Sequence, residues 1–425
     1  MDIILNAVNG FIGLGPTILI AIIFTILGLV FGAGVRKSFR SGITTAVGLA
    51  GIFLVVNVIT GSYVPALNAL STRIGITRPV LDVGWSVAGF GWGWPGAVGV
   101  VLGTVVVSII MILFKLTKVL WTDFWSLWHS QVMAAMVWGV TGNVILGIIA
   151  AIIYNIVVMK LADYTAKENQ EFHQVPNITI PCGYVSIFGS IAKLVAPLLR
   201  MIPGIKDVDA SPEVIREKLG VFGEMPVLGA LIGLIIGIAA GLPSVAAVLT
   251  LALNTALMLV LLPRMVAVLM EGMTPVARQV SDWLVEHFGD REINVAVDCA
   301  VQLGHPAVMA SAIIVMPIAI LLSAFLPGTS FLIIASLAGI PYLCGSIVAH
   351  TKGNVLHTVI LALIFIIPMM YLASLPMISD AYTVTADKLG LLKGLVSTAG
   401  QQITAPDPGG DFMTPIFVGL ANLFR

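Results

Sequence analysis

Charged residues are scarce in this sequence. Asp, Glu, Lys and Arg make up only 10% of the 425 residues, and none of them occurs between Pro306 and Thr351. A soluble protein of this length needs far more charge on its surface. Together with 58% hydrophobic residues and a mean hydropathy of +1.05, the shortage of charge excludes an ordinary soluble fold. The formal net charge is zero, so nothing indicates a nucleic-acid partner.

Sequence patterns that carry catalysis or bind cofactors are also missing. The chain has three cysteines, Cys182, Cys299 and Cys344, and an odd number in apolar contexts argues against a disulfide framework. The six histidines are scattered, without the spacing of metal ligands. No phosphate loop, dinucleotide fingerprint or hydrolase nucleophile motif is present. We therefore expect no metal site, no cofactor and no catalytic residue on this chain.

Long apolar runs are abundant instead. A spanning helix needs about 20 mostly apolar residues, and ten runs qualify or nearly do. They are Phe11–Gly34, Ser41–Thr60, Trp94–Phe114, Phe124–Val140, Asn143–Leu161, Phe222–Leu242, Val245–Leu262, Ala307–Leu326, Phe331–Val348 and Val355–Leu375. The first run is long enough to span and follows no basic segment, so we expect no cleavable signal peptide. The fold class predicted is an all-α polytopic membrane protein.

The distribution of basic residues predicts the orientation. If the N-terminus lies outside, sixteen of the 21 Lys and Arg residues fall in segments on the inner side, among them Lys37 and Lys118. Cytoplasmic loops of membrane proteins carry the excess of Lys and Arg. We therefore predict an external N-terminus.

The two halves of the chain resemble each other. Gly142-Asn-Val144 opens the fifth run and Gly353-Asn-Val355 opens the tenth, while Asp82 and Asp298 precede the third and the eighth. Since each half has five helices, an odd number, the second half must be inverted relative to the first. An inverted repeat places the substrate site near the midplane of the membrane. The two five-helix units predicted are residues 1–161 and 222–376.

A broken apolar segment follows each five-helix unit. Val175–Pro203 is interrupted at Ile180-Pro-Cys-Gly-Tyr184, and Thr383–Pro415 is interrupted by a run of Pro and Gly. We predict two re-entrant hairpins whose tips line a cavity. The first hairpin and a cytoplasmic linker occupy residues 162–221, and the second hairpin and the C-terminal segment occupy 377–425. Two amphipathic segments, Pro65–Ile74 and Pro275–Phe288, are predicted to be helices in the membrane interface.

Ionisable residues at the ends of the apolar runs are the candidate site. Such groups are costly at membrane depth and usually serve a substrate or ion path. Asp298, Gln302 and His305 are spaced so that one helical face presents all three. The alternatives are that Asp298 caps a helix and that His305 lies in a loop before Pro306.

Other candidates have competing structural interpretations. Asp82 either contacts substrate, as the partner of Asp298 in the other half, or caps a helix. Asp123 lies in the site or pairs with Lys118 or Lys115. Glu224 opens the sixth run, where a carboxylate also suits the positive end of the helix dipole. Trp85 either stacks on substrate or anchors the chain at the interface.

Four motifs resemble one family. Leu116–His129, which reads LTKVLWTDFWSLWH, is one of them, together with Val80–Trp85, Gly223–Pro226 and Val297–Pro306. Taken in their order along the chain, the four motifs resemble the galactitol-type enzyme IIC of the bacterial phosphotransferase system, which is related to the ascorbate-type IIC permeases. The resemblance runs from about Gly15 to Gly353.

The resemblance implies a homodimer in the bacterial inner membrane. Such a protein binds a polyol, galactitol or a related sugar alcohol, and carries it across for phosphorylation by the IIB subunit, which is served by IIA. The phosphorylated cysteine would belong to IIB. His129 becomes a substrate-binding candidate, and so does Cys182, which stands where relatives often have His or Gln. Relatives continue into an eleventh helix, so ten to eleven spanning helices are expected. The alternative is an ion-coupled secondary transporter of a small polar solute.

Overall fold

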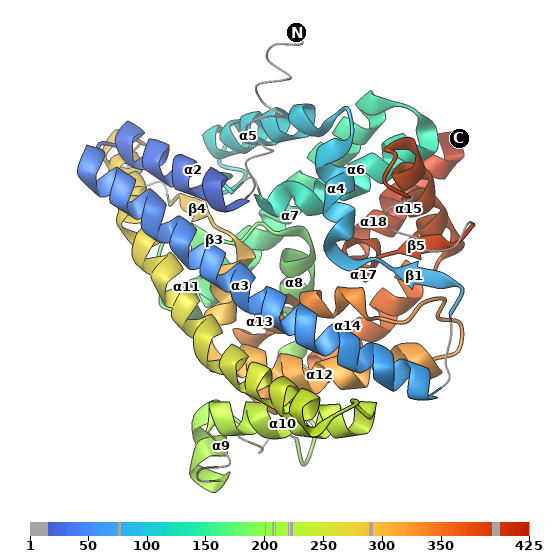
Figure 1. Cartoon of the computed structure of the whole chain (residues 1–425). Helices are drawn as coiled ribbons and strands as arrows, with labels where there is room; N and C mark the ends of the chain where they lie inside the picture. The colour runs from blue at the N-terminus through green and yellow to red at the C-terminus, as the bar shows by residue number, and fades with distance from the viewer. Residues whose placement is uncertain are drawn as a thin grey trace.

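The structure is a computed structural model built almost entirely of helices (Figure 1). It describes residues 16–74, 78–123, 125–199, 201–205, 208, 210–219, 221, 224–288, 292–392 and 400–424. Several predicted features lie partly outside the described residues. They include the first apolar run before Pro16, Phe124 of the fourth run, Arg200 of the first broken segment, Phe222 of the sixth run, Gly223 of the Gly223–Pro226 motif, and residues 393–399 of the second broken segment.

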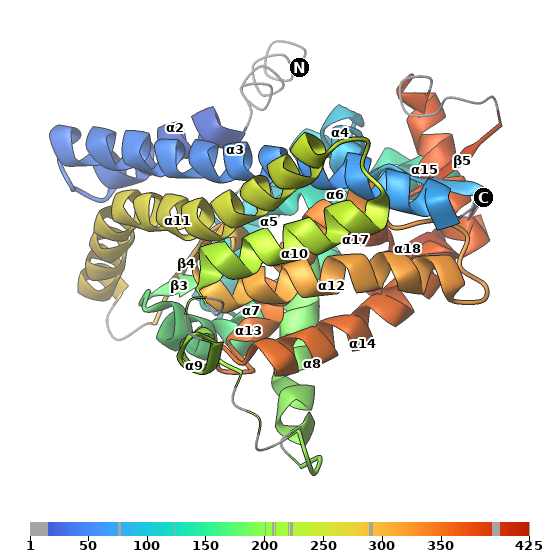
Figure 2. The same ribbon diagram turned by 60° about the horizontal axis from the view of Figure 1, so that its bottom comes forward.

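Two pairs of helices form one side of the molecule. Helix α2 (Pro16–Val30) packs on α3 (Val35–Ile74), and α10 (Met225–Ala240) packs on α11 (Val245–Phe288). The long helices α3 and α11 run side by side (Figure 1), and α10 lies between α11 and α12 (Figure 2). This layer covers the part of the chain that holds the site.

The separate interfacial helices predicted from Pro65–Ile74 and Pro275–Phe288 are wrong. Helix α3 continues through Pro65 to Ile74, and α11 continues through Pro275 to Phe288. An interior proline removes one backbone hydrogen bond, whereas ending the helix leaves several groups unpaired. In an apolar environment, continuing the helix therefore costs less free energy than ending it.

The remaining elements follow a similar order in the two halves. In the first half they are β1 (Val80–Asp82), η1 (Gly84–Val87), α4 (Ala88–Gly93), α5 (Ala97–Leu113), β2 (Val119–Leu120), η2 (Trp125–Leu127), α6 (Trp128–Thr141), α7 (Val144–His173), β3 (Ile178–Thr179), α8 (Gly183–Leu199) and α9 (Pro212–Leu219). In the second half they are β4 (Asn294–Ala296), η4 (Cys299–Gly304), α12 (Pro306–Phe325), η5 (Ala335–Gly339), α13 (Ile340–Val348), α14 (Val355–Ala373), α15 (Pro376–Lys388), β5 (Gln402–Thr404), α17 (Pro406–Gly409), α18 (Met413–Ala421) and η6 (Asn422–Phe424).

The short strands join segments that are far apart in the sequence. Strand β1 pairs in parallel with β5, with Asp82 opposite Thr404. Strand β4 lies between β2 and β3, also in parallel, with Ala296 opposite Thr179. Each broken apolar segment is therefore hydrogen-bonded to a strand of the other half.

The coarse fold class, a helical protein with membrane-like apolar helices, is confirmed. Among the described residues, α7, α12 and α14 are long and apolar enough to cross a membrane, and they match the fifth, eighth and tenth predicted runs. The third run, Trp94–Phe114, forms α5, which makes an angle of 85° with the preceding helical segment Gly84–Gly93. The ninth run is divided between η5 and α13. The total of ten spans stays a prediction.

The two Gly-Asn-Val motifs have the same structural role. Asn143 accepts hydrogen bonds at Oδ1 from the backbone N–H groups of Ile145 and Leu146, and Asn354 Oδ1 accepts one from His357 N–H. Each asparagine thus caps the long helix that follows, α7 or α14. The preceding Gly142 and Gly353 adopt φ of 72° and 77°, a conformation that glycine alone adopts without cost.

Exposed apolar side chains form stripes along the helices. On α7 they recur every fourth residue at Ile145, Ile149 and Ile153, and on α11 at Val245, Leu249, Leu253 and Leu257. Residues four apart share one helical face. Apolar faces of this extent are typical of surfaces that contact lipid or another protein.

The crossing of α3 and α11 provides a test of the packing. A Cβ added at Gly48 would lie 2.3 Å from the backbone N of Leu269, and one at Gly272 would lie 2.3 Å from the N of Thr45. We expect Gly48→Ala to lower the free energy of unfolding by about 1–3 kcal/mol, because overpacking forces the helices apart. Gly61→Ala is the control, since a Cβ there meets open space. Melting temperatures in detergent measure both; an unchanged value for Gly48→Ala contradicts the close approach.

Candidate functional site

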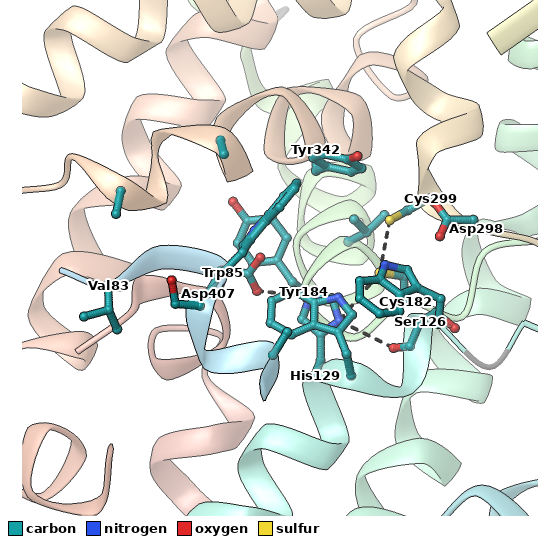
Figure 3. A pocket seen from close by; sticks show the side chains of 17 residues that line it. Val83, Trp85, Ser126, His129, Cys182, Tyr184, Asp298, Cys299, Tyr342 and Asp407 are labelled. Carbon is teal, nitrogen blue, oxygen red and sulfur yellow. Dashed lines mark hydrogen bonds and ion pairs between the residues drawn. The ribbon is translucent and has the colours of Figure 1, made fainter. Parts of the chain in front are cut away.

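A cavity of about 570 Å³ lies where the two broken segments meet η1, η2 and α6 of the first half and η4, η5 and α13 of the second (Figure 3). Its wall combines apolar surface with a few polar groups. The residues that line it are Val83, Trp85, Ser86, Ala88, Trp125, Ser126, Trp128, His129, Cys182, Tyr184, Val185, Asp298, Cys299, Ala335, Ala338, Tyr342 and Asp407. The size and the mixture of surfaces are typical of small-molecule sites.

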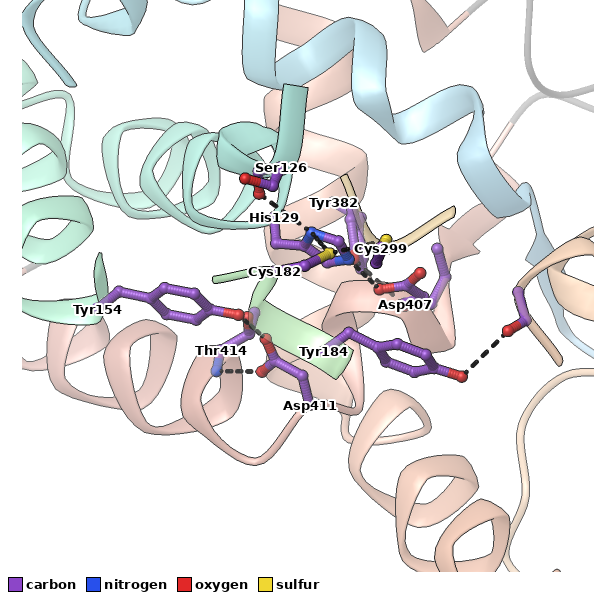
Figure 4. Close-up of polar contacts among 12 residues, drawn as sticks. Ser126, His129, Tyr154, Cys182, Tyr184, Cys299, Tyr382, Asp407, Asp411 and Thr414 are labelled. Carbon is purple, nitrogen blue, oxygen red and sulfur yellow. Dashed lines mark hydrogen bonds and ion pairs between the residues drawn. The ribbon is translucent and has the colours of Figure 1, made fainter. Parts of the chain in front are cut away.

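A histidine and an aspartate form an ion pair in this wall. His129, in the first turn of α6, places Nε2 3.0 Å from Oδ1 of Asp407 in α17 (Figure 4). The side chains are 3% and 7% exposed. Neither of these two atoms makes a hydrogen bond to another group in the described part of the chain. Beside this contact the Asp407 oxygen still has a lone pair that can accept a hydrogen bond from water or a polar ligand.

Two cysteines and a second aspartate lie on the opposite side of His129. Cys182 Sγ is 3.8 Å from His129 Nδ1 and 3.2 Å from Cys299 Sγ. Asp298 precedes Cys299 and caps η4, since its Oδ1 accepts a hydrogen bond of 2.7 Å from Ala300 N–H. Asp298 therefore caps a helix, as one of the two interpretations predicted, and it also lines the cavity, while its contact with substrate stays a prediction.

Aromatic rings supply most of the apolar surface. Trp85 packs edge-on against Tyr342, with ring centroids 5.3 Å apart, and Tyr184 lies nearly parallel to the His129 ring at 6.3 Å. Trp85 comes from η1 and Tyr342 from α13, so the two halves both contribute. The indole Nε1 of Trp85 is buried without a hydrogen-bond partner within the described ranges. It is a donor available to a bound molecule.

Asp82 does not line the cavity. Its Oδ1 accepts hydrogen bonds from Gly84 N–H and the Ser336 hydroxyl, and its Oδ2 accepts from the N–H groups of Ile334 and Ser336. A carboxylate with four such bonds has its charge well compensated. Asp82 therefore fixes η5 against β1, which positions Ala335 and Ala338 in the cavity wall.

Asp298, Gln302 and His305 do not share one face in the structure, although their spacing in the sequence predicted a common face of an α-helix. The segment forms the 3₁₀ helix η4 at Cys299–Gly304, and Asp298 and His305 lie outside it as caps. Gln302 Nε2 donates to Asn169 Oδ1 at 3.1 Å, away from the cavity. The expectation of one shared α-helical face is therefore wrong, because the segment is not α-helical.

His305 has a local structural role. Its Nδ1 accepts a hydrogen bond of 3.2 Å from Ala307 N–H at the start of α12, and its ring packs on Phe172 at 4.6 Å. Burial lowers the pKa of His305, although the nearby Glu213 opposes the shift. The imidazole is thus kept neutral, which suits an acceptor at a helix start.

Asp123 and Glu224 lie outside the main cavity. Asp123 Oδ1 accepts a hydrogen bond from Trp125 N–H, whereas Asp123 Oδ2 is buried and has no hydrogen-bond partner among the described residues. Asp123 and Asp298 both line a second, small pocket. Lys118 pairs with Glu292 rather than with Asp123. Glu224 is exposed before α10, and its side chain makes no capping hydrogen bond.

Asp407 is the most important residue that the sequence analysis missed. It lies in the Pro- and Gly-rich break of the second hairpin, the counterpart of the position of Cys182 in the first. A single acid within such a break is a signal that the pattern contained. Tyr184, Tyr342 and Cys299 were missed as well, and they carry no comparable local signal.

A buried tyrosine holds both hairpin tips. The Tyr154 hydroxyl donates to Asp411 Oδ2, and Asp411 Oδ1 accepts a 2.7 Å bond from Thr414 N–H (Figure 4). On the other side, a Cβ at Gly183 would lie 2.2 Å from the Tyr154 hydroxyl oxygen. Tyr154 therefore contacts the hairpin of each half and fixes Cys182 and Asp407 relative to each other.

The chemistry of the site is that of binding. Donors, acceptors and aromatic faces converge, as needed for a neutral molecule with several hydroxyl groups. In the parts of the chain that the structure describes, no three His, Cys, Asp or Glu side chains are placed to hold a metal ion.

The different environments of two acids give a prediction. We expect Asp82→Asn to lower the free energy of unfolding by about 1–3 kcal/mol, because an amide cannot accept all four hydrogen bonds. Glu224→Gln, an equally conservative change at an exposed acid, is the control and should leave the melting temperature unchanged. Thermal unfolding of both variants in detergent checks this. Equal melting temperatures would contradict the structural role of Asp82.

Comparison with known proteins identifies the family. Residues 10–392 match the family described as "PTS system sugar-specific permease component". The chain is 32% identical over 406 residues to the "PTS system galactitol-specific EIIC component" of Escherichia coli K12, which covers 95% of this chain and 88% of that protein. It is 30% identical to a "Putative permease IIC component" of the same organism, over 94% of this chain and 91% of that protein. The chain belongs to the family of phosphotransferase-system sugar-specific permease components.

Proposed function

We propose that this chain is the membrane subunit, enzyme IIC, that binds a sugar alcohol and carries it across the bacterial inner membrane. Galactitol or a related polyol is the substrate class, and separate IIB and IIA subunits supply the phosphoryl group. The galactitol-specific relative supports the class of substrate. The observation that carries the proposal is the cavity with the His129–Asp407 pair in its wall.

The cavity matches the chemistry of a linear polyol. Each hydroxyl is both donor and acceptor, and the carbon chain between them presents C–H groups. Asp407 and Asp298 offer acceptors, Trp85 Nε1 offers a donor, and His129 offers one or the other according to its tautomer. The rings of Trp85, Tyr184 and Tyr342 cover the C–H faces.

We also propose that residues 1–161 and 222–376 are two related units, inverted relative to each other in the membrane. Two observations support it. Strand β1 of the first half pairs with β5 of the second broken segment, and β4 of the second half pairs with β3 of the first. Asp82 and Asp298 each accept a bond at Oδ1 from the N–H two residues on, at the start of η1 and η4. Both the pairing of strands between the halves and the matching positions of the two aspartates are expected of two related halves.

The contacts of basic residues support the predicted division of the loops between two sides of the membrane, whichever side is cytoplasmic. Residues assigned to the outer side meet helix ends assigned to that side: Arg73 donates to Ala239 O, Arg78 to Ala324 O, and Lys388 to Gly139 O. Residues assigned to the inner side meet inner ends, as Lys160 does with Leu116 O. We propose a cytoplasmic face at the α2–α3 turn, and a homodimer that uses the α2, α3, α10 and α11 layer.

The test of the site is polyol binding by purified variants. We expect Asp407→Asn to weaken galactitol binding on the order of 10- to 100-fold, because hydrogen bonds to a charged group contribute roughly 1.5–3 kcal/mol. His129→Gln retains a donor and an acceptor, so its loss should be smaller. Calorimetry measures both, after monodispersity is verified.

Glu224→Gln is the control for this experiment and should bind as the wild type does. Wild-type affinity in well-folded Asp407 and His129 variants would remove both residues from the site. Uptake by membrane vesicles that lack IIB tests the wider function. Accumulation driven by a proton or sodium gradient would favour the ion-coupled transporter instead.

The orientation has its own test. We expect cysteines introduced at Lys37 and Lys118 to resist an impermeant thiol reagent in intact cells, because both exposed positions face the cytoplasm. Lys388→Cys, on the opposite side, should react. Ready labelling at Lys37 and Lys118 would reverse the orientation.

A further inference from the structure

Two thiols face each other in the cavity wall at an unusually short distance. Cys182 and Cys299 are both unoxidised, and the Cys182 thiol donates a hydrogen bond to the Cys299 sulfur with the sulfur atoms 3.2 Å apart. A disulfide needs about 2.05 Å between sulfurs. The two atoms are thus only about 1.2 Å too far apart to be bonded.

Strand pairing explains why the thiols meet. Thr179 of β3 is opposite Ala296 of β4 in a parallel register, and the ladder continues with a 2.9 Å bond from Val297 N–H to Thr179 O. Cys182 and Cys299 each lie three residues beyond the last residue of their strand, in the turn before α8 and at the start of η4. The paired strands thus bring the two chain segments together just before the cysteines, and the two sulfur atoms meet at 3.2 Å.

We propose that Cys182 and Cys299 are a reversible disulfide site that controls the polyol cavity. A peroxide oxidises one thiolate to a sulfenic acid and is reduced to water or an alcohol. The second thiol then displaces water from that sulfenic acid as the S–S bond forms. The two cysteines lose two electrons in total, which the peroxide gains. A thiol such as glutathione reverses the reaction by disulfide exchange, giving its own disulfide.

The bond would alter the site directly. It draws Cys182 Sγ away from its position 3.8 Å from His129 Nδ1, and it pulls on Asp298, which is bonded to Cys299 in the chain. It also ties the first hairpin to η4, so that two walls of the cavity move as one. This consequence rests on the proposed function, whereas formation of the bond rests on the sulfur geometry alone.

The experiment compares reduced and peroxide-treated protein in detergent, with peptide mass spectrometry and galactitol calorimetry as parallel readouts. We expect a Cys182–Cys299 linked peptide, free Cys344, and a galactitol dissociation constant at least tenfold higher that dithiothreitol restores. Cys344 provides the matched control, because it is buried in α13 and does not line the cavity. Cys344→Ser should respond as the wild type does, and Cys299→Ser should not respond. Bound galactitol should slow the oxidation.

The two readouts separate the inference from the proposed function. Absence of the linked peptide, with Cys182 and Cys299 still thiols after excess peroxide, overturns the disulfide site. A linked peptide with unchanged galactitol affinity overturns control of the cavity. A linked peptide in a protein that binds no polyol even when reduced supports the disulfide site and contradicts the proposed function instead.

Discussion

Interrupted segments inside a membrane protein must still satisfy their backbone hydrogen bonds, and here short parallel strands do so. Strand β5 of the second hairpin pairs with β1, and β3 of the first hairpin pairs with β4. Without these ladders the unpaired N–H and C=O groups would each cost several kcal/mol in an apolar environment. The same ladders determine where the cavity lies. Four of its polar side chains come two or three residues after a strand: Trp85 after β1, Cys182 after β3, Asp298 after β4 and Asp407 after β5.

Two buried aspartates, Asp82 and Asp407, differ in how many hydrogen bonds their carboxylates accept. Asp82 and Asp407 belong to paired strands or follow them, and both are nearly inaccessible. Asp82 accepts four hydrogen bonds from neighbouring groups, so it holds η5 in place. Asp407 meets His129 through one oxygen that is otherwise unpaired among the described residues. The carboxylate of Asp82 has its hydrogen-bonding capacity filled and stabilises the wall, whereas that of Asp407 can still accept a hydrogen bond.

The sequence predicted the parts of this arrangement that depend on local patterns. Long apolar runs predicted α7, α12 and α14, and the matching Gly-Asn-Val motifs marked where α7 and α14 begin, although the capping by Asn143 and Asn354 was seen only in the structure. Trp85 and Asp298 were candidates because they lie at the ends of apolar runs, and His129 and Cys182 were candidates because of the family resemblance. The structure brings all four to one cavity.

Pairing across the halves was not predictable in this way. No local pattern shows that Thr404 lies opposite Asp82, so Asp407 was overlooked although its Pro-rich break was noticed. Likewise, the spacing of Asp298, Gln302 and His305 fits an α-helix, but the chain forms a 3₁₀ helix there. Gln302 then turns to Asn169 and His305 to its own helix start. Sequence spacing is informative only when the helix type is known.

The unpaired polar atoms of the cavity also explain how such a site would discriminate between ligands. His129 Nε2, Asp407 Oδ1 and Trp85 Nε1 are buried, and none has another hydrogen-bond partner in the described structure. A hydroxyl that accepts a hydrogen bond from Trp85 Nε1, or donates one to Asp407 beside its contact with His129, satisfies groups that are costly to leave unpaired. An analogue that lacks this hydroxyl loses the bond and also leaves a buried group without a partner, a cost of about 1–3 kcal/mol. Sites built in this way reject a missing hydroxyl more strongly than an added methylene group. Selectivity for polyols over apolar isosteres would then follow from the same incomplete hydrogen bonding that distinguishes Asp407 from Asp82.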